Sequence, residues 1–184
     1  NDKWPMGQVE LIKTLFDWIS HAIPKGAKVL VEADRGIGCS PDLLKAIQSM
    51  GWYYLVRVKG NVHLTLNDGK EVCFSSLVPS IGTSCSAQVY AFKKAGWLKC
   101  WAVGQWKPHY DEAWLLLTNL PEAEGSWYAI RMWQELAFKD FKSTGWQWQR
   151  SHVWKPEHSN ILWLVMSLAY VWVISMGSHV IYNL

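Results

Sequence analysis

Four polar residues between positions 128 and 142 have types and spacing that could do chemistry. They are Tyr128, Arg131, Glu135 and Lys142. At about 100° per residue in an α-helix, they fall within an arc of roughly 60° on one face. A carboxylate can bind a cation, and the flanking cations can bind phosphate groups. The alternative is a solvated face on which Arg131 and Glu135 form an i, i+4 pair worth roughly 0.3 kcal/mol.

A second candidate carboxylate, Asp34, ends the short apolar run VLVEAD at residues 29–34. The run is rich in β-branched residues and is followed by RGIG, which predicts a buried strand that stops at a turn. An acid at the end of such a strand is well placed for a site. The neighbouring acids Glu32 and Asp140 are interpreted as ordinary solvated charges.

The elements around Asp34 predict a parallel crossover unit. Residues 29–34 and 52–60 have the pattern of strands, and the helix between them, residues 40–51, opens with a capping serine followed by proline. Strand, helix and strand within about thirty residues join parallel strands and indicate the α/β class. An amphipathic helix at residues 6–22 precedes this unit.

Between residues 61 and 120 the pattern changes to short extended segments separated by turn signals such as NDGK and SIGTS. A parallel sheet would need helices between its strands, so these segments predict an antiparallel insertion on the α/β core. A long helix is then expected at residues 127–143, with its polar stripe facing a ligand. Its opposite faces are expected to contact the core through Ile130, Trp133, Leu136, Ala137 and Phe141.

The run ILWLVMSLAYVWVISMG, residues 161–177, is the candidate membrane segment. At 17 residues it lies at the lower limit for crossing about 30 Å of hydrocarbon. It follows the cap-compatible PEHSN and ends at Gly177, which suits a helix that closes a core. We expect a buried helix and no membrane partner, and a small membrane-associated protein is the alternative.

Composition sets only broad limits. The chain has 184 residues, half of them apolar, and a net charge of +3, so it can form a globular core but its charge does not identify a partner. The cysteines form no C-x-x-C pair and have no histidine pair to complete a zinc site, so we expect free thiols in a reducing compartment. They are Cys39, Cys73, Cys85 and Cys100.

The polar stripe also matches a known pattern. Its spacing, Y-x2-R-x3-E-x6-K, resembles the signature of bacterial insertion-sequence transposases of the DDE type. VEADRGIG is similar to the segment that holds the second catalytic aspartate of that family, and YYLVRVKG is similar to the strand after it. AWLLLTNLP resembles the segment before the signature helix, and GWQWQRSHV and ILWLVMSLAYVW resemble the loop and closing helix that follow. The resemblance covers nearly the whole chain.

This resemblance implies an incomplete RNase H-like core of the α/β class. Residues 1–60 would form its first part, residues 61–120 an antiparallel β-rich insertion between the second catalytic Asp and the catalytic Glu, and residues 121–184 the signature and closing helices. The family's first catalytic aspartate lies on an earlier strand. Asp2, just before the first helix, is on the wrong kind of element, so the chain is expected to be a C-terminal part without the first strands and inactive as a fragment.

The resemblance also implies metal-dependent DNA cleavage and strand transfer at transposon ends. Asp34 and Glu135 would be catalytic ligands of Mg²⁺ or Mn²⁺, and two such metals about 4 Å apart stabilise the attacking and leaving oxygens. Trp114 either packs in its strand or stacks on a flipped base. The implied DNA-binding residues are Tyr128, Arg131, Lys142, Arg57 and Trp114.

The implied partners are transposon-end and target DNA and a second copy of the enzyme in a homodimeric synaptic complex. The implied location is the bacterial cytoplasm, in association with the nucleoid. The alternative function is that of a non-catalytic transposase remnant that binds DNA or an intact transposase.

Overall fold

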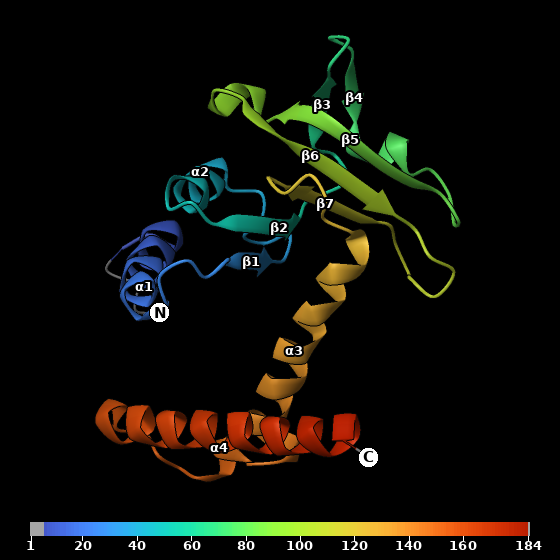
Figure 1. Cartoon of the computed structure of the whole chain (residues 1–184). Helices are drawn as coiled ribbons and strands as arrows, with labels where there is room; N and C mark the ends of the chain where they lie inside the picture. The colour runs from blue at the N-terminus through green and yellow to red at the C-terminus, as the bar shows by residue number, and fades with distance from the viewer. Residues whose placement is uncertain (1–5, 184) are drawn as a thin grey trace. The chain divides into compact units, whose positions relative to one another are not determined.

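The structure is a computed structural model that describes residues 6–183, so Asp2 lies outside the described residues. The chain divides into two compact units, Asn1–Ala129 and Ile130–Leu184. The first unit contains a β-sheet with two α-helices, and the second is helical (Figure 1).

The two helices of the first unit form where their sequence patterns predict them. Helix α1 spans Gln8–Ala22 and α2 spans Pro41–Ser49. The side chain of Ser40 accepts a hydrogen bond from the backbone N–H of Leu43 at 3.4 Å, which confirms the predicted N-cap. The apolar face of α2 is buried in the core, whereas α1 packs there through half-buried residues.

Within residues 6–183, seven strands form one sheet in the order β1-β2-β7-β6-β5-β3-β4 (Figure 1). The strands are β1 Leu30–Ala33, β2 Tyr53–Arg57, β3 His63–Leu66, β4 Glu71–Cys73, β5 Ser84–Ala91, β6 Leu98–Gln105 and β7 Trp114–Thr118. Strands β1 and β2 are parallel, which confirms the predicted crossover through α2. The other neighbouring strands are antiparallel, as predicted for residues 61–120.

The antiparallel strands continue the sheet that β1 and β2 begin. After β2 the chain crosses to the far edge of the sheet, where β3 pairs with β4 and β5. It returns through β6 to β7, which lies beside β2 with Thr118 opposite Leu55. This return brings the segment just before β7 next to the end of β2, although more than fifty residues separate them in the chain.

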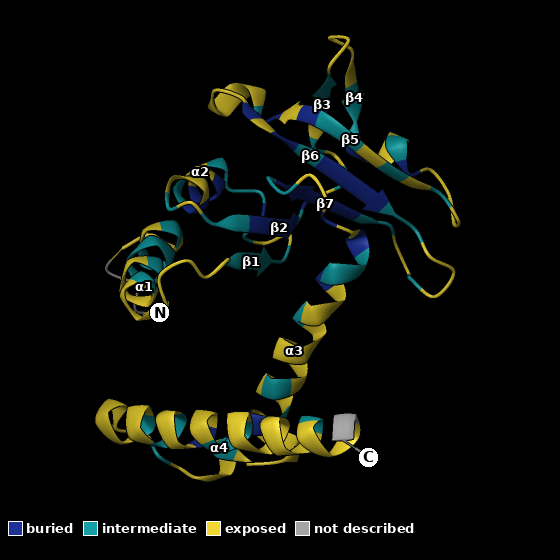
Figure 2. Cartoon of the chain, in the orientation of Figure 1, coloured by how far each residue is buried: buried dark blue, intermediate teal, exposed yellow. Residues whose placement is uncertain are grey.

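The centre of the sheet is covered on both faces, as Figure 2 shows by the dark colour of β2, β6 and β7. Successive side chains of a strand point to opposite faces. On β2, Tyr54 and Val56 belong to the larger hydrophobic cluster under α2, and Leu55 belongs to a second cluster that includes Leu116 and Tyr128. Burial on both faces explains why these strands are nearly continuous apolar runs.

The cysteines, all in the first unit, are free thiols, as predicted. Burial raises the pKa of Cys100 to about 12 and also raises that of Cys85.

A continuous helical segment, residues 125–144, covers the long helix predicted at residues 127–143, but it is α-helical only at Arg131–Lys139. The chain forms a 3₁₀-helix, η3, at Gly125–Ile130, then α3 at Arg131–Lys139, and then a π-helical turn, η4, at Asp140–Thr144. These turns advance by different angles per residue, so angles drawn at 100° per residue hold only within α3. The second unit then contains a short 3₁₀ turn, η5, at Trp148–Arg150.

The core contacts predicted for α3 are largely wrong. Ile130, Trp133 and Leu136 are exposed, and Ala137 is half-buried. Phe141 is buried as predicted, because it packs edge-on against two aromatic rings of the second unit. The hydrophobic contacts of this unit therefore centre on η4 and not on α3.

The closing helix, α4, is longer and more exposed than predicted. It spans Pro156–Asn183, continues past Gly177, and buries Met166 while most of its described residues are exposed. The prediction of a buried helix at residues 161–177 is therefore wrong. In the described part of the chain, Pro156–Ile181 is long and apolar enough to cross a membrane by length and composition. Core helices of soluble proteins pass the same test, so one such helix is weak evidence for a span.

Candidate active site

Asp34 is held in a tight turn directly after β1. Its Oδ1 accepts hydrogen bonds from the backbone N–H groups of Gly36 at 2.9 Å and Ile37 at 3.3 Å. Its carbonyl oxygen also accepts from the N–H of Gly38 at 2.7 Å. Short polar side chains favour this kind of turn because they bond the backbone two or three residues on. The turn fixes the carboxylate at the carboxyl end of a parallel strand.

The glycines of RGIG let this turn lie close to β2. A Cβ atom at Gly38 would lie 2.4 Å from the carbonyl oxygen of Arg57, which is closer than two such atoms can pack. A Cβ at Gly36 would lie 3.1 Å from Oδ1 of Asp34. The turn that carries Asp34 is thus fitted against the end of the neighbouring strand.

Arg57 is placed beside this turn by the register of the sheet. Ala33 of β1 is paired with Val56 of β2, so the next residues, Asp34 and Arg57, leave the adjacent ends of two parallel strands. The structure therefore brings together two of the predicted site residues, the carboxylate residue Asp34 and the cationic residue Arg57. The Arg57 side chain is only 17% exposed and donates a hydrogen bond to the carbonyl oxygen of Ala113 at 3.4 Å.

A carboxylate that was not singled out in the sequence, Glu112, holds two arginines at this place. Arg35 donates to both oxygens of Glu112, at 2.8 and 2.9 Å, in a bidentate pair. Nη2 of Arg57 lies 3.0 Å from Oε1 of the same carboxylate. Bidentate pairing fixes the plane of a guanidinium as well as its position.

The hydrogen bonds from Arg35, together with the charges of both arginines, lower the pKa of Glu112. Glu112 in turn raises the pKa of Arg35. The pairing therefore favours the ionised form of Glu112, which lies between two guanidiniums. No motif or periodicity marks Glu112, because its position depends on β7 lying beside β2.

A cavity of about 290 Å³ opens beside these arginines. The polar residues that line it include Arg35, Arg57, Glu112 and Ser75, and the Trp106 side chain forms part of the wall. With two guanidiniums against one carboxylate, this wall can attract an anionic group such as a phosphate.

Two further predicted residues, Trp114 and Tyr128, pack on one another inside the first unit. The Trp114 ring stacks on Tyr110 at 4.2 Å between centroids and meets the Tyr128 ring edge-on at 5.3 Å. Tyr128 is 5% exposed and belongs to the second hydrophobic cluster. These contacts favour the packing alternative for Trp114.

The remaining predicted residues belong to the second unit. Arg131 and Glu135 form an ion pair, the i, i+4 contact that the sequence allows on a solvated face. The Glu135 side chain is 52% exposed. Lys142 lies in the π-helical turn η4 and is exposed.

The predicted residues thus fall into three groups. Asp34 and Arg57 lie together, Trp114 and Tyr128 pack together, and Arg131 pairs with Glu135. In the part of the chain that the structure describes, no group of three His, Cys, Asp or Glu side chains is arranged to hold a metal ion.

Comparison with known proteins identifies the class. The family model of the transposase DDE domain matches residues 7–172, and the chain therefore belongs to this family. The family carries out the DNA cleavage and transfer of transposition, binds DNA at transposon ends and generally uses divalent metal ions. No curated protein matches the chain. The prediction of a DDE-type transposase is confirmed, whereas the Y-x2-R-x3-E-x6-K signature and the roles of single residues stay predictions.

Proposed function

We propose that this chain forms part of the catalytic domain of a transposase that cleaves DNA and transfers strands at transposon ends. In this proposal, residues 1–60 and 121–184 contribute to an RNase H-like core and residues 61–120 are its β-rich insertion. Asp34 and Glu135 are its metal-binding carboxylates. The observation that carries the proposal is the transposase DDE match over residues 7–172, within which Asp34 sits in a glycine turn at a parallel strand end.

The donor chemistry of the two acids fits Mg²⁺ or Mn²⁺. Carboxylate oxygens are the hard ligands that these cations prefer. Bound metal would stabilise the charge that develops on the attacking and leaving oxygens of the phosphodiester. Asp34 and Glu135 would hold it, and both are acids whose ionised forms metal binding requires.

The side chains around each acid would bind the DNA backbone. Arg57 and Arg35, held by Glu112, would contact phosphates near Asp34. Arg131 and Lys142 would do the same near Glu135, once the Arg131–Glu135 ion pair is shared with a phosphate or a metal.

Tyr128 and Trp114 have a different part in the proposal. Tyr128 is buried and would position Trp114 through their edge-on contact. Stacking of Trp114 on a flipped base would require the Tyr110 ring to leave the face that it covers.

Two carboxylates are fewer than the three of the DDE triad. We therefore expect the 184 residues alone to bind metal weakly and not to cleave DNA. The proposal includes a homodimer that pairs two transposon ends, in the bacterial cytoplasm and near the nucleoid.

Metal-directed cleavage of the protein backbone tests whether Asp34 and Glu135 share a metal. Fe²⁺ with ascorbate and peroxide would replace Mg²⁺, and the radicals it forms cut the chain near the bound ion. We expect cuts near both residues 34 and 135, and we expect Asp34→Asn or Glu135→Gln to suppress both sets of cuts. Asp68→Asn and Glu157→Gln, at exposed acids outside the two motifs, are matched controls.

The shared metal site would be contradicted if each substitution removed only the cuts near its own residue. If Glu135→Gln removes only the cuts near residue 135, the two acids do not bind one metal. If no cuts occur while transposon-end DNA still binds the chain, the non-catalytic remnant is the better description.

A further inference from the structure

One face of the sheet, over β3, β5 and β6, carries aromatic and cationic side chains away from the acids discussed above. Tyr90 of β5 is opposite Thr65 of β3 and Lys99 of β6, so the three side chains share a face. Tyr90 is 36% exposed, whereas its neighbours Val89 and Ala91 are fully buried on the other face or in the core. This face is called the distal face below and carries His63, Thr65, Glu71, Tyr90, Lys93, Lys94, Trp97 and Lys99.

Trp97 presents its ring at this face. It is 40% exposed and meets the Tyr90 ring edge-on, with 6.3 Å between centroids. The ammonium group of Lys93 lies 5.5 Å from the centre of the Trp97 ring. Two contacts therefore hold the ring in place without covering it.

The backbone that carries Trp97 is unusual. Phe92 and Trp97 have φ angles of +57° and +53°, in the left-handed region that bulky residues rarely adopt. They flank the short helix η2, Lys93–Ala95, whose last carbonyl accepts a hydrogen bond from Lys45 of α2 at 2.6 Å. Such backbone persists only where the surrounding structure enforces it, and it is concentrated at functional positions.

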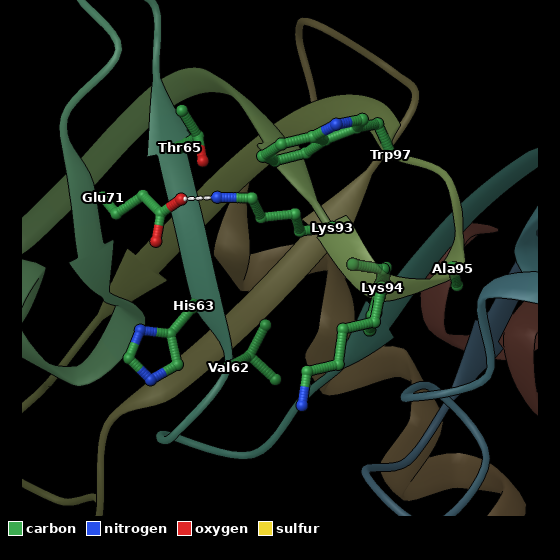
Figure 3. Close-up of a pocket in the computed structure, with 9 residues that line it drawn as sticks. Val62, His63, Thr65, Glu71, Lys93, Lys94, Ala95 and Trp97 are labelled. Atoms are coloured by element: carbon green, nitrogen blue, oxygen red, sulfur yellow. Dashed lines mark hydrogen bonds and ion pairs between the residues drawn. The ribbon is translucent and has the colours of Figure 1, made fainter.

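A cavity of about 550 Å³ lies next to the Trp97 ring (Figure 3). Its polar lining includes His63, Thr65, Lys93 and Lys94. In Figure 3, Lys93 extends from beneath Trp97 to an ion pair with Glu71, and Lys94 extends from the same turn. Among the described residues that line the cavity, Glu71 is the acidic one, and the hydrogen bond from Lys93 lowers its pKa.

The charge of the distal face is therefore positive. Lys93, Lys94 and Lys99 outweigh the carboxylate of Glu71, which is already paired with Lys93. An exposed aromatic ring beside several cations on a sheet is the combination that binds single-stranded nucleic acid, because bases stack on the ring and phosphates pair with the cations.

We propose that the distal face binds single-stranded DNA. One base stacks on Trp97 in the 550 Å³ cavity, and Lys94 and Lys99 bind the flanking phosphates. A double helix does not offer an unstacked base to Trp97, so the single strand is preferred. This site goes beyond the proposed cleavage function, because it requires neither Asp34 nor Glu135 nor a metal.

Fluorescence anisotropy of a labelled oligothymidylate of about 12 nucleotides tests this site in the full chain. EDTA in the buffer separates the result from metal binding, so this test can succeed or fail independently of the cleavage proposal. We expect Trp97→Ala to weaken binding about tenfold, within the range for loss of one stacked base, and Trp97→Phe to keep most of the affinity. Trp154→Ala, at a tryptophan that is 81% exposed in the other unit, is the matched control and should change it less than twofold.

The lysines are tested by salt dependence. The double variant Lys94→Ala with Lys99→Ala should reduce the slope of log K against log salt by about 1.4, or about 0.7 for each lost phosphate contact. The matched double variant Lys25→Ala with Lys28→Ala removes two exposed lysines before β1 and should leave the slope unchanged.

Three results would overturn the proposal. The first is equal binding by Trp97→Ala and wild type, with both folded by circular dichroism. The second is an equal loss in the two lysine pairs, which would mean non-specific attraction. The third is loss of self-association, not of oligonucleotide binding, in Trp97→Ala, which would make the distal face a protein interface.

Discussion

The sheet-bearing unit and the helical unit bury their apolar side chains to opposite extents (Figure 2). Leu117 in the middle of the sheet is fully buried, whereas Leu168 in the middle of α4 is 64% exposed. Both residues lie in nearly continuous apolar runs. The difference shows that an apolar run indicates burial only when a second surface is positioned to cover it.

The sheet-bearing unit has such surfaces on both sides. Helix α2 covers one face, and η3 with the loop before it covers the other. In the helical unit, the buried contacts centre on Phe141, whose ring packs against Trp163 and Tyr170, and on Met166. Most of α4 has no such cover, and an exposed apolar surface of this extent marks a place where another surface binds.

The largest expected effect follows from separating the two units. Residues 6–129 should fold alone and melt cooperatively, because their core is internal. Residues 130–184 should not melt cooperatively as a monomer, since a few buried side chains cannot offset the conformational entropy of ordering them. Circular dichroism melts and sedimentation of the two pieces would measure this. A cooperative unfolding transition of monomeric residues 130–184 would show that the helical unit buries enough apolar surface to fold alone.

The same comparison can be made with one pair of leucines. Leu117→Ala should lower the free energy of unfolding by about 2–5 kcal/mol, because it leaves a cavity in a packed core. Leu168→Ala should change it by less than about 0.5 kcal/mol. Urea denaturation of the full chain measures both, and similar losses would mean that α4 is covered in solution.

Local patterns predicted most of the elements of the sheet-bearing unit correctly. The Ser40 cap, the β-branched run before Asp34 and the turn signals between strands each depend on neighbouring residues. The order of the strands could not be predicted in this way, because the pairing of β7 with β2 joins segments about sixty residues apart. The place of Glu112 beside Arg57 depends on the same pairing and has no local pattern that predicts it.

The part of the candidate site that the parallel strands β1 and β2 position could be predicted from the sequence, and the other parts could not. Asp34 and Arg57 are neighbours because adjacent parallel strands end at the same edge. Tyr128 is predicted to lie on the polar stripe, but its ring is buried, because η3 packs against the sheet and Tyr128 joins the cluster with Leu55 and Leu116. The apolar spacing of α3 predicts an apolar helix face, but it does not show whether another surface covers that face.

Two glycines should respond to alanine with opposite signs. Gly38→Ala should destabilise the chain by about 1–3 kcal/mol, because its Cβ would lie 2.4 Å from the Arg57 carbonyl oxygen. Gly177→Ala should stabilise α4 by up to about 1 kcal/mol, since a Cβ there meets nothing within 4 Å and alanine favours helix. Thermal melts of both variants give the signs. Destabilisation by Gly177→Ala would show that α4 is closely packed at that position.

The smallest expected effect comes from Glu112, whose folded pKa is lowered by Arg35 and Arg57. A carboxyl with a lowered pKa in the folded state stabilises the fold above its unfolded pKa, about 4.3, and loses this contribution as pH falls through the folded value. Glu112→Gln should therefore cost about 0.5 kcal/mol near pH 7, a small figure because the side chain is half exposed, and this cost should disappear as pH falls through the folded pKa.

Two controls distinguish the pairing of Glu112 with the two arginines from a general effect of removing one negative charge. One is added salt, and the other is a substitution at a second glutamate. The cost of Glu112→Gln should shrink at about 1 M salt, where an exposed ion pair is screened. Glu122→Gln, at an exposed position in the loop after β7, should show no such dependence on pH or salt. A cost for Glu112→Gln that persists once the carboxyl is protonated would mean that its side chain acts by packing, because no charge would then remain to pair with the two arginines.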